Sequence, residues 1–332
     1  MSATTLVTGA SGFIGRQLVR QLIEAGEWVR IICRHPEVLA RAHGPRLEVV
    51  QGDILDRTAM TRAMDGVGTV FHLAGCARAW SRNPREFWDV NVAGTELLLD
   101  LASRAGVDRI VHVSTVLTLP ELRRTWLPHG IRKPTEYEHT KLMGEQRVQS
   151  YVASGGDAVI VHPTRVYGPG PLTDANGATK MIALYLAGRF RLRVADGDVL
   201  GNYAHVADVA RGMILAAHWG RSGAHYVLGG ENASIRDLFE LVMELTGVKR
   251  RMVAVPPTAA IGVGHLSEFW GRLGGQVLIT ADWVRVYLED QGVDITPTVR
   301  ELGYAPRPLR AGIAETLEWL GCRAGREQEL AA

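Results

Sequence analysis

Apolar residues along the chain follow two alternating patterns. Short, nearly continuous apolar runs, typical of buried β-strands, occur at 5–8, 29–33, 47–50, 69–73, 109–114 and 158–161. Between most of these runs the apolar residues recur at helical spacing, notably over 84–105 and 137–154. Right-handed crossovers place helices on both faces of a parallel sheet. The pattern therefore predicts an α/β fold with a Rossmann-type, doubly wound parallel sheet.

The alternation of strands and helices becomes less regular after residue 163. Turn-forming clusters occupy 168–171 and 196–198, and helices are expected over 208–218 and 234–246. A chain of 332 residues is also too long for an average single core. We expect a dinucleotide-binding Rossmann domain over residues 1–163 and a mainly substrate-binding region over residues 164–332, interwoven with the first.

Charge and cysteine content exclude several classes of protein. The 37 Lys and Arg residues nearly balance 35 Asp and Glu, so no basic field is available to attract nucleic acid. Cys33, Cys76 and Cys322 have neither the number for a closed disulfide framework nor the spacing of a zinc site. No secretory leader or membrane-spanning apolar run is recognisable. These observations favour a cytoplasmic protein with a small-molecule substrate and no metal.

A glycine-rich turn follows the first predicted strand and opens the first predicted helix. Gly9, Gly12 and Gly15 are spaced by three residues, so the turn is one residue longer than the G-x-G-x-x-G fingerprint. Glycines let the backbone approach a pyrophosphate, and the N-terminus of the helix offers free N–H groups. Ser11 is expected to cap that helix and to reach a phosphate. The turn therefore predicts dinucleotide binding, whereas an isolated glycine cluster would indicate only a turn.

The ends of the next strands supply further candidate cofactor contacts. Arg34 stands where an acidic residue would bind the ribose hydroxyls, and a guanidinium suits a 2′-phosphate, so we favour NADP over NAD. The alternative is that Arg34 is only a solvated loop residue. Asp53 is positioned to accept a hydrogen bond from the adenine amino group. The expected cofactor-binding residues so far are Gly9, Ser11, Gly12, Phe13, Ile14, Gly15, Arg34, Asp53, Ile54, Leu73, Ala74 and Gly75.

Tyr137 and Lys141 are candidate catalytic residues because they lie one helical turn apart. An ammonium beside a phenol favours the phenolate and brings its pKa toward a useful range. The same lysine can bind the nicotinamide ribose. A hydroxyl at the end of the preceding strand can polarise a substrate carbonyl. Thr115 is our first choice and Ser114 the alternative, since adjacent residues of an extended chain point in opposite directions.

Taken together, these motifs resemble the extended short-chain dehydrogenase/reductase family, also called the NAD-dependent epimerase/dehydratase family, over nearly the whole chain. The motifs that carry the resemblance lie at 7–15, 52–54, 71–75, 91–95, 113–115, 137–141, 167–170 and 205–208. The resemblance implies a catalytic hydroxyl at Thr115, a proton-transferring Tyr137, a ribose-binding Lys141 and a Pro163 beside the nicotinamide. Asn91 and Asp208 match frequent family positions that we interpret as structural. Family members often form homodimers, and the same is expected here.

Departures from family patterns narrow the activity. Sugar-nucleotide dehydratases carry an Asp-Glu pair after the catalytic threonine, and this chain has Val116 and Leu117 there. Epimerases usually have an asparagine and an arginine for the substrate diphosphate where this chain has Arg165 and Gly201. Arg165 leaves the epimerase reading open, because it could contact phosphate by another geometry.

The segments at 162–164 and 302–319, together with Arg34, look more like the dihydroflavonol reductase and 3β-hydroxysteroid dehydrogenase branch. This resemblance implies an NADPH-dependent ketone reductase or secondary alcohol dehydrogenase acting on a hydrophobic, natural-product-like substrate. The alternative is a sugar-nucleotide epimerase with bound NAD. A non-catalytic NADP-sensing protein is a third reading, which the intact pair of Tyr137 and Lys141 argues against.

Two segments allow more than one interpretation. Residues 256–283 carry apolar side chains that would either line a substrate pocket or, as is usual for helical spacing, form core. The residues concerned are Ile261, Val263, Leu266, Phe269, Trp270 and Leu273. Residues 118–134 show little periodicity and are expected to form either a flap over the substrate or an ordinary surface loop.

Overall fold

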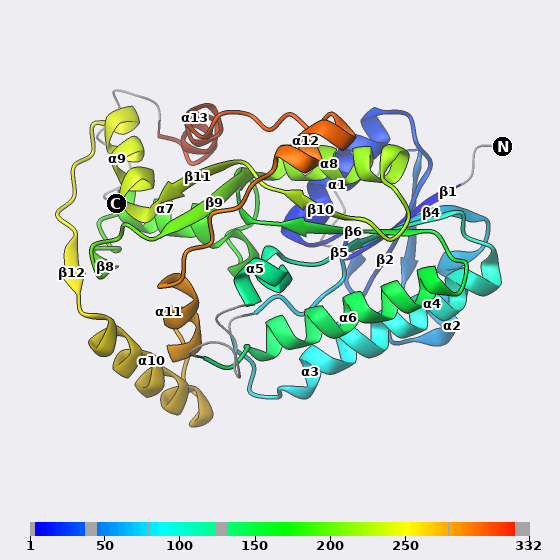
Figure 1. Ribbon diagram of the computed structural model, residues 1–332, viewed down its shortest axis with the longest axis horizontal. Helices are drawn as coiled ribbons and strands as arrows, with labels where there is room; N and C mark the ends of the chain where they lie inside the picture. The colour runs from blue at the N-terminus through cyan, green and yellow to red at the C-terminus, as the bar shows by residue number, and fades with distance from the viewer. Residues whose placement is uncertain (1–3, 37–44, 79, 124–131, 278, 323–332) are drawn as a thin grey trace.

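A parallel seven-stranded sheet forms the centre of the protein (Figure 1). The computed structural model describes residues 4–36, 45–78, 80–123, 132–277 and 279–322. The strands lie in the order β10-β6-β5-β4-β1-β2-β3. Their bounds are β1 Thr4–Thr8, β2 Val29–Cys33, β3 Leu47–Gln51, β4 Val67–His72, β5 Arg109–Val113, β6 Ala158–Pro163 and β10 His225–Leu228. The predicted α/β class and the six predicted strands are confirmed, whereas β10 was missed because its buried residues alternate with more exposed ones and form no continuous apolar run.

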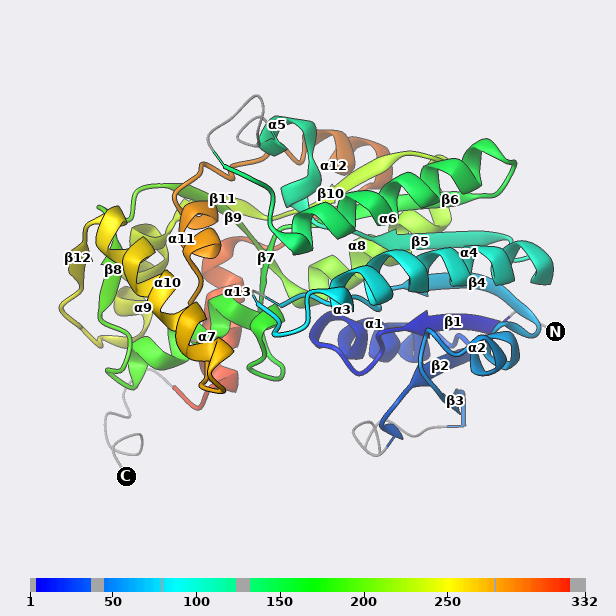
Figure 2. The ribbon, with the colours of Figure 1, turned by 90° about the horizontal axis from the view of Figure 1, so that it is seen from below.

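Helices cover both faces of this sheet (Figures 1 and 2). One face carries α1 Phe13–Glu24, α8 Val206–Trp219 and α12 Thr296–Leu302; the other carries α2 Arg57–Met64, α4 Gly94–Ala105 and α6 Glu136–Ala153. Most of these helices turn an apolar side toward the strands, and two separate buried clusters result, one on each side; α6 differs, because its buried side is mainly polar. The near-continuous apolar character of the strands follows from this burial on both faces.

The long helical pattern at 84–105 is interrupted. α3 Arg85–Trp88 continues through a π-helical turn, Asp89–Ala93, into α4. A π-turn inserts one extra residue per turn and often marks a functional site. α4 ends at Gly106, whose φ of 69° is a left-handed conformation that suits glycine.

The second half of the chain builds a smaller body at one end of the sheet (Figure 2). It contains a three-stranded sheet, β11-β9-β7, and a two-stranded pair, β12-β8. The strand bounds are β7 Arg165–Tyr167, β8 Leu192–Val194, β9 Leu200–His205, β11 Glu231–Ser234 and β12 Val253–Val255. The helices are α7 Gly177–Leu186, α9 Ile235–Thr246, α10 Pro257–Arg272, α11 Ala281–Tyr287 and α13 Leu309–Trp319, while α5 Pro120–Arg123 precedes α6.

The large apolar side chains of α10 and of Leu273, which follows it, do not form core, so that interpretation of residues 256–283 was wrong for them, while the substrate-pocket interpretation stays a prediction. Val263, Leu266, Phe269, Trp270 and Leu273 are each more than half exposed. Residues 118–134 were expected to form either a flap or a surface loop. Residues 124–131, which would decide between the two, lie outside the described residues. Among the described residues, no helix combines the length and apolar character needed to cross a bilayer.

Candidate functional site

The predicted cofactor and catalytic residues gather where the central strands end. Strands β1, β2, β3, β4, β5 and β6 are parallel, so their carboxyl ends lie at one edge of the sheet. The glycine turn follows β1, Arg34 follows β2, and Asp53 lies two residues beyond β3. Residues 73–75, Thr115 and Pro163 occupy the ends of β4, β5 and β6. In open α/β sheets this edge is where ligands bind.

The turn between β1 and α1 requires glycine at two of its three positions. Gly9 has a φ of 69°, and a Cβ there would lie 2.6 Å from the backbone nitrogen of Ala74. A Cβ on Gly15 would lie 2.2 Å from the carbonyl oxygen of Gly9. Gly12 is the N-cap of α1. No side chain caps this helix, so the prediction that Ser11 caps it was wrong. The N–H groups of the first turn therefore remain available to a pyrophosphate, which fits a bound dinucleotide.

An exposed cation and a carboxylate lie together at the expected adenosine end. Nε of Arg34 is 3.8 Å from Oδ2 of Asp53, and both side chains are more than a third exposed. Oδ1 of Asp53 accepts a hydrogen bond from the backbone N–H of Leu55 at 2.9 Å. Such an exposed, long ion pair is weak and salt-screened, so the guanidinium can turn toward an added anion.

Thr115 and Tyr137 meet at the end of β5. The Thr115 side chain lies close enough to the Tyr137 phenol to act on its pKa, and it opposes the effect of burial on that group. Burial is the larger effect and raises the pKa of Tyr137 to about 12, so the prediction that Lys141 brings this pKa toward a useful range was wrong for the protein without a bound cofactor. Ser114 points the other way, as alternation along the strand requires, and its hydroxyl donates to the Glu145 carboxylate. The structure thus places Thr115, and not Ser114, beside the phenol.

Lys141 lies one turn after Tyr137 on α6, in a largely buried position. Its Nζ donates to the carbonyl oxygen of Val113, the last residue of β5, at 2.6 Å. Burial lowers the pKa of Lys141 to about 8, while the negative charge of Glu145 acts in the opposite direction. A Cβ placed on Gly75 would come within 3.9 Å of Nζ. The ammonium therefore lies between the ends of β4 and β5, next to the candidate cofactor edge.

The first turn of α6, which carries Tyr137, is fixed by buried charges. Thr135 and Glu138 form a capping box, with the Glu138 carboxylate accepting from the Thr135 N–H at 2.7 Å. The fully buried Glu138 also accepts two hydrogen bonds from Arg132, at 2.7 and 2.8 Å. Arg132 donates on its other side to Glu289, at 2.6 and 3.0 Å. Burial works against the charged guanidinium, but these carboxylates more than compensate and raise the pKa of Arg132.

Sequence reasoning missed Arg132, Glu138 and Glu289. One local signal could have pointed to Glu138: Thr135 and Glu138 lie three residues apart, the spacing of a capping box at the start of a helix.

Asn91 ties the loop after β4 to the same helix. It lies in the π-helical turn, where its Oδ1 accepts from the Cys76 N–H at 2.8 Å and its Nδ2 donates to the Thr140 hydroxyl at 2.9 Å. Thr140 lies between Tyr137 and Lys141 on α6. Asn91 is buried and fully engaged, which agrees with its interpretation as structural. Asp208, the other such residue, holds the backbone and guanidinium of Arg307.

A polar chain that runs from the buried Glu145 and His162 to the exposed His225 lies behind Thr115. Glu145, His162 and His225 offer atoms within 4.8 Å of one another, close enough for a cation. Hydrogen bonds already account for this arrangement: Nδ1 of His162 donates to the Thr115 carbonyl at 2.9 Å, and Nε2 accepts from Nδ1 of His225 at 2.8 Å. Burial lowers the pKa of His162 to about 4, so this imidazole is neutral near pH 7. The sequence signal missed here was Glu145, one turn after Lys141 on the same helix.

Arg165, which replaces the asparagine of epimerases, is already engaged. Its Nε and Nη2 donate to Oε1 of Gln291 at 3.3 and 3.2 Å, and its guanidinium carbon lies 4.7 Å from the centre of the Tyr287 ring. It also occupies the space above Gly201, where a Cβ would lie 2.5 Å from Nη1. The two positions at which epimerases hold a diphosphate are thus filled by one side chain with its own partners.

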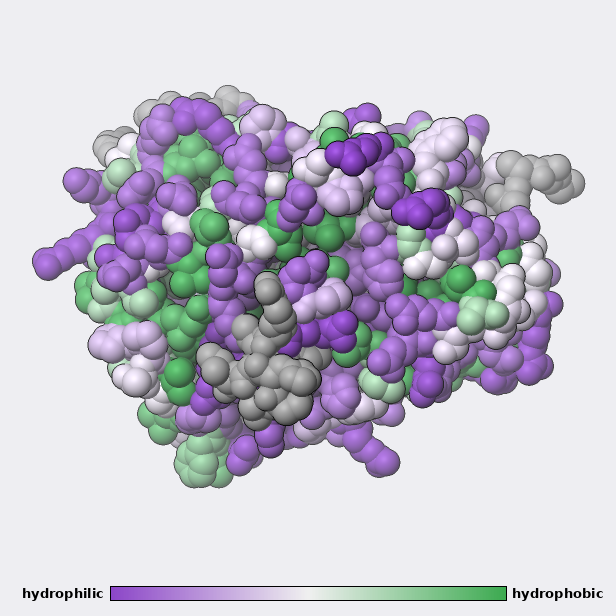
Figure 3. Space-filling view, viewed as in Figure 1, coloured by the Kyte–Doolittle hydropathy of each residue, from purple (hydrophilic) through white to green (hydrophobic). Residues whose placement is uncertain are grey.

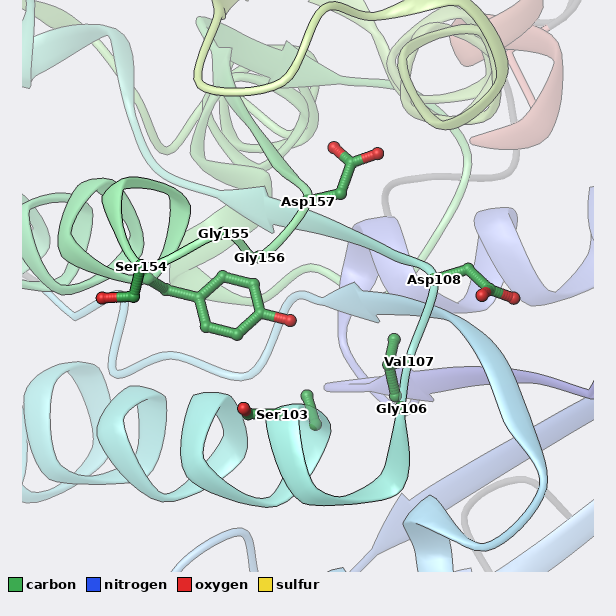
Figure 4. A pocket seen from close by; sticks show the side chains of 10 residues that line it. Ser103, Gly106, Val107, Asp108, Ser154, Gly155, Gly156 and Asp157 are labelled. Atoms are coloured by element: carbon green, nitrogen blue, oxygen red, sulfur yellow. The ribbon is translucent and has the colours of Figure 1, made fainter.

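A hollow of about 300 Å³ lies at the opposite edge of the sheet (Figure 4). Its lining includes Gly106, Asp108, Gly155 and Asp157, which precede β5 and β6. It is therefore at the amino ends of the strands, away from Tyr137 and the cofactor edge. In doubly wound sheets ligands bind at the carboxyl ends, so this hollow is not the candidate active site.

Known proteins resemble this chain over nearly its full length. It is 31% identical to sterol demethylase protein B of Methylococcus capsulatus, over 95% of this chain and 98% of the relative. It is 33% identical to 4-hydroxy-2-methyl-3-oxo-4-farnesyl-3,4-dihydroquinoline-1-oxide ketoreductase of Stigmatella aurantiaca, covering 91% and 92%. It is 30% identical to a 3 beta-hydroxysteroid dehydrogenase/Delta 5-->4-isomerase of Mycobacterium tuberculosis, covering 91% and 85%.

Solved structures show the same fold. MoeE5 in complex with UDP-glucose and NAD superposes with a TM-score of 0.73 at 26% identity, covering 95% of this chain and 98% of that one. The model of the NAD dependent epimerase/dehydratase family matches residues 5–229, more than half of the chain. Dehydrogenases and reductases are among the relatives, which supports an NAD(P)-dependent oxidoreductase. This chain therefore belongs to the NAD-dependent epimerase/dehydratase family and is an extended short-chain dehydrogenase/reductase.

Proposed function

We propose that this protein is an NADPH-dependent ketone reductase, able to oxidise the corresponding secondary alcohol in reverse, with a hydrophobic, natural-product-like substrate. The observation that carries the proposal is the meeting of Thr115, Tyr137 and Lys141 at the carboxyl edge of the sheet. Relatives whose names specify sterol, hydroxysteroid or farnesylated ketone chemistry support an apolar substrate. The engaged Arg165 disfavours the alternative, a sugar-nucleotide epimerase with bound NAD.

Each catalytic group has one task in this proposal. When bound, the reduced nicotinamide supplies the hydride. Thr115 donates a hydrogen bond to the substrate carbonyl and orients it. Tyr137 donates its phenolic proton to the oxygen that becomes the alcohol. The ammonium of Lys141 stabilises the resulting phenolate and binds the ribose. Among the other predicted residues, the glycine turn would hold the pyrophosphate and Pro163 would lie beside the nicotinamide.

The activity can be tested directly with purified protein and a panel of ketones. NADPH oxidation on steroidal or prenylated ketones, with much weaker oxidation of NADH, is the expected result. Short polar ketones, tested as control substrates, should be reduced poorly. Protein that purifies with tightly bound NAD, interconverts UDP-sugars and reduces no apolar ketone would instead be the epimerase.

Arg34 should determine the cofactor preference. Arg34→Ala removes the charge-assisted bonds to a 2′-phosphate, so we expect KM for NADPH to rise about 10- to 100-fold while KM for NADH changes little. The matched control is Arg57→Ala, an exposed arginine at the start of α2 that pairs with Asp100. Steady-state kinetics with both cofactors provide the measurement. Equal changes with the two cofactors would show that Arg34 is an ordinary loop residue.

The reduction rate should depend on the charge of Lys141. The pKa of this lysine is lowered to about 8, so its ammonium is present below that pH and is lost as pH rises through it. Since the neutral amine cannot stabilise the phenolate that forms, kcat should fall about tenfold per pH unit above about pH 8. His72 and His112, which also face Lys141, have lowered pKa values and are neutral in this range.

Glu145→Gln tests whether the charge of Lys141 controls the fall of kcat at alkaline pH. Its negative charge raises the pKa of Lys141, so the alkaline limb of the kcat profile should move to lower pH in the variant. Glu96→Gln, an exposed carboxylate on α4 paired with Arg147, is the control and should leave the profile unchanged. An alkaline limb that stays in place in Glu145→Gln would exclude this coupling.

A further inference from the structure

The helix α10 packs on the protein by its small residues and exposes its large ones. Ala260, Gly264 and Gly271 are buried, and a Cβ on Gly264 would lie only 2.4 Å from the backbone nitrogen of Ala281. We define the α10 face as the side chains of Val263, Leu266, Phe269, Trp270 and Leu273, which are 57–69% exposed. A helix that only covers a core has the opposite arrangement.

Figure 3 shows hydrophobic surface over α10, at the lower left of the view, bordered by polar side chains. β12, which leads into the helix, and its partner β8 expose further apolar side chains. Leu192 and Val253 pair directly with one another there and are 59% and 50% exposed. A contiguous patch of this kind, unlike scattered single residues, indicates an interaction site.

Exposed arginines accompany this apolar surface. Arg191 directly precedes Leu192, and Arg251 lies two residues before Val253. Arg272 is the last residue of α10. Arg82 donates to the carbonyl oxygen of Gly271, so it lies beside the same helix. Within the described parts of the chain, none of these four arginines pairs with a carboxylate. The acidic residue of the helix, Glu268, is turned inward and accepts from the Ala281 N–H at 2.7 Å.

We propose that the α10 face and its arginines dock this protein onto the surface of an anionic lipid bilayer. An amphipathic helix with aromatic and leucine side chains can bury its apolar face at the boundary between headgroups and acyl chains. Arginines beside it are attracted to anionic headgroups. A second copy of the chain fits less well, because a two-fold contact through this face would bring the same unpaired arginines together.

The docking surface adjoins the catalytic end through one loop. Trp80 and Arg82 follow the end of β4, and a Cβ on Gly271 would lie 3.1 Å from the Trp80 ring. Gly75, earlier in that loop, lies near Nζ of Lys141. Docking would therefore hold the active-site edge near the membrane, which suits an apolar substrate. The inference itself rests on the α10 face and stands whether or not the proposed reductase activity is correct.

Vesicle sedimentation tests the proposal without any turnover assay. Wild-type protein is expected to bind vesicles of phosphatidylcholine with about one-third phosphatidylglycerol about tenfold or more tightly than pure phosphatidylcholine vesicles. Leu266→Asp/Phe269→Asp should lose binding to both, and Arg251→Gln/Arg272→Gln should weaken binding to the anionic vesicles by about 25-fold, or about fivefold per charge. Raised salt should weaken wild-type binding.

Controls separate this surface from general stickiness and from misfolding. Trp219→Asp and Val299→Asp change exposed apolar residues on α8 and α12 and should bind anionic vesicles like the wild type. Thermal melts should show that all variants are folded, because the altered side chains are exposed. Wild-type protein that binds vesicles no better than Leu266→Asp/Phe269→Asp would overturn the proposal. So would a wild-type dimer that these substitutions dissociate, with no vesicle binding, since the face would then join two copies.

Discussion

Replacing Tyr137 with phenylalanine is expected to lower kcat for ketone reduction by about 10²- to 10⁴-fold while leaving the affinity for NADPH nearly unchanged. The substitution removes the proton donor and keeps the ring, so the packing at the start of α6 is preserved. Lys141 and the glycine turn, which would hold the cofactor, are untouched. Steady-state kinetics give kcat, and a thermal shift with NADPH reports cofactor binding.

Tyr151→Phe is the matched control for this variant. Tyr151 lies on the same helix, α6, but near the amino ends of the strands, where it lines the hollow of Figure 4. The control should retain wild-type kcat. Turnover by Tyr137→Phe within about threefold of wild type would remove the phenol from the mechanism, because a general acid contributes at least about a hundredfold.

The second large effect is expected on stability. Arg132→Met leaves the fully buried carboxylate of Glu138 without its cation and also removes one partner of Glu289. Breaking a buried ion pair in this way costs about 3–5 kcal/mol of unfolding free energy. Because Arg132 also fixes the first turn of α6, we expect kcat to fall together with stability. Urea denaturation followed by circular dichroism measures the change.

Two further variants distinguish buried-charge loss from loss of packing. Arg147→Met breaks an exposed ion pair with Glu96 on the same helix and should cost at most about 1 kcal/mol. Arg132→Met/Glu138→Gln should recover part of the lost stability, since the uncompensated charge is gone. Equal destabilisation by Arg132→Met and Arg147→Met would mean that the cluster around Arg132 contributes no more than a surface pair.

The parallel sheet and the cofactor turn could be predicted because they depend on local patterns. Six strands are buried on both faces, so their apolar runs are unbroken. Gly12 and Gly15 are required by their close approach to the carbonyl oxygen of Gly9, a few residues away, whereas Gly9 itself approaches the backbone of Leu73 and Ala74. β10 was missed because its residues alternate between buried and more exposed instead of forming an apolar run, and its place in the sheet depends on pairing with β6.

In the candidate site, too, some features could be predicted from local spacing and others depended on tertiary contacts. The spacing of Tyr137 and Lys141 was sufficient to place them one helical turn apart, whereas the choice between Thr115 and Ser114 required knowing which hydroxyl faces Tyr137 and which faces Glu145. The cluster of Arg132, Glu138 and Glu289 joins residues 157 positions apart, which periodicity cannot reveal.

By itself the sequence determined the Rossmann-type sheet, the dinucleotide turn and the pair of Tyr137 and Lys141, because residues close along the chain dictate each of them. Only the tertiary structure decided that Thr115 lies against the phenol, that Arg165 is held by Gln291, and that the large residues of α10 face outward. The physical reason is the same in each case: helical or strand spacing defines which side chains share a face, but not what that face packs against.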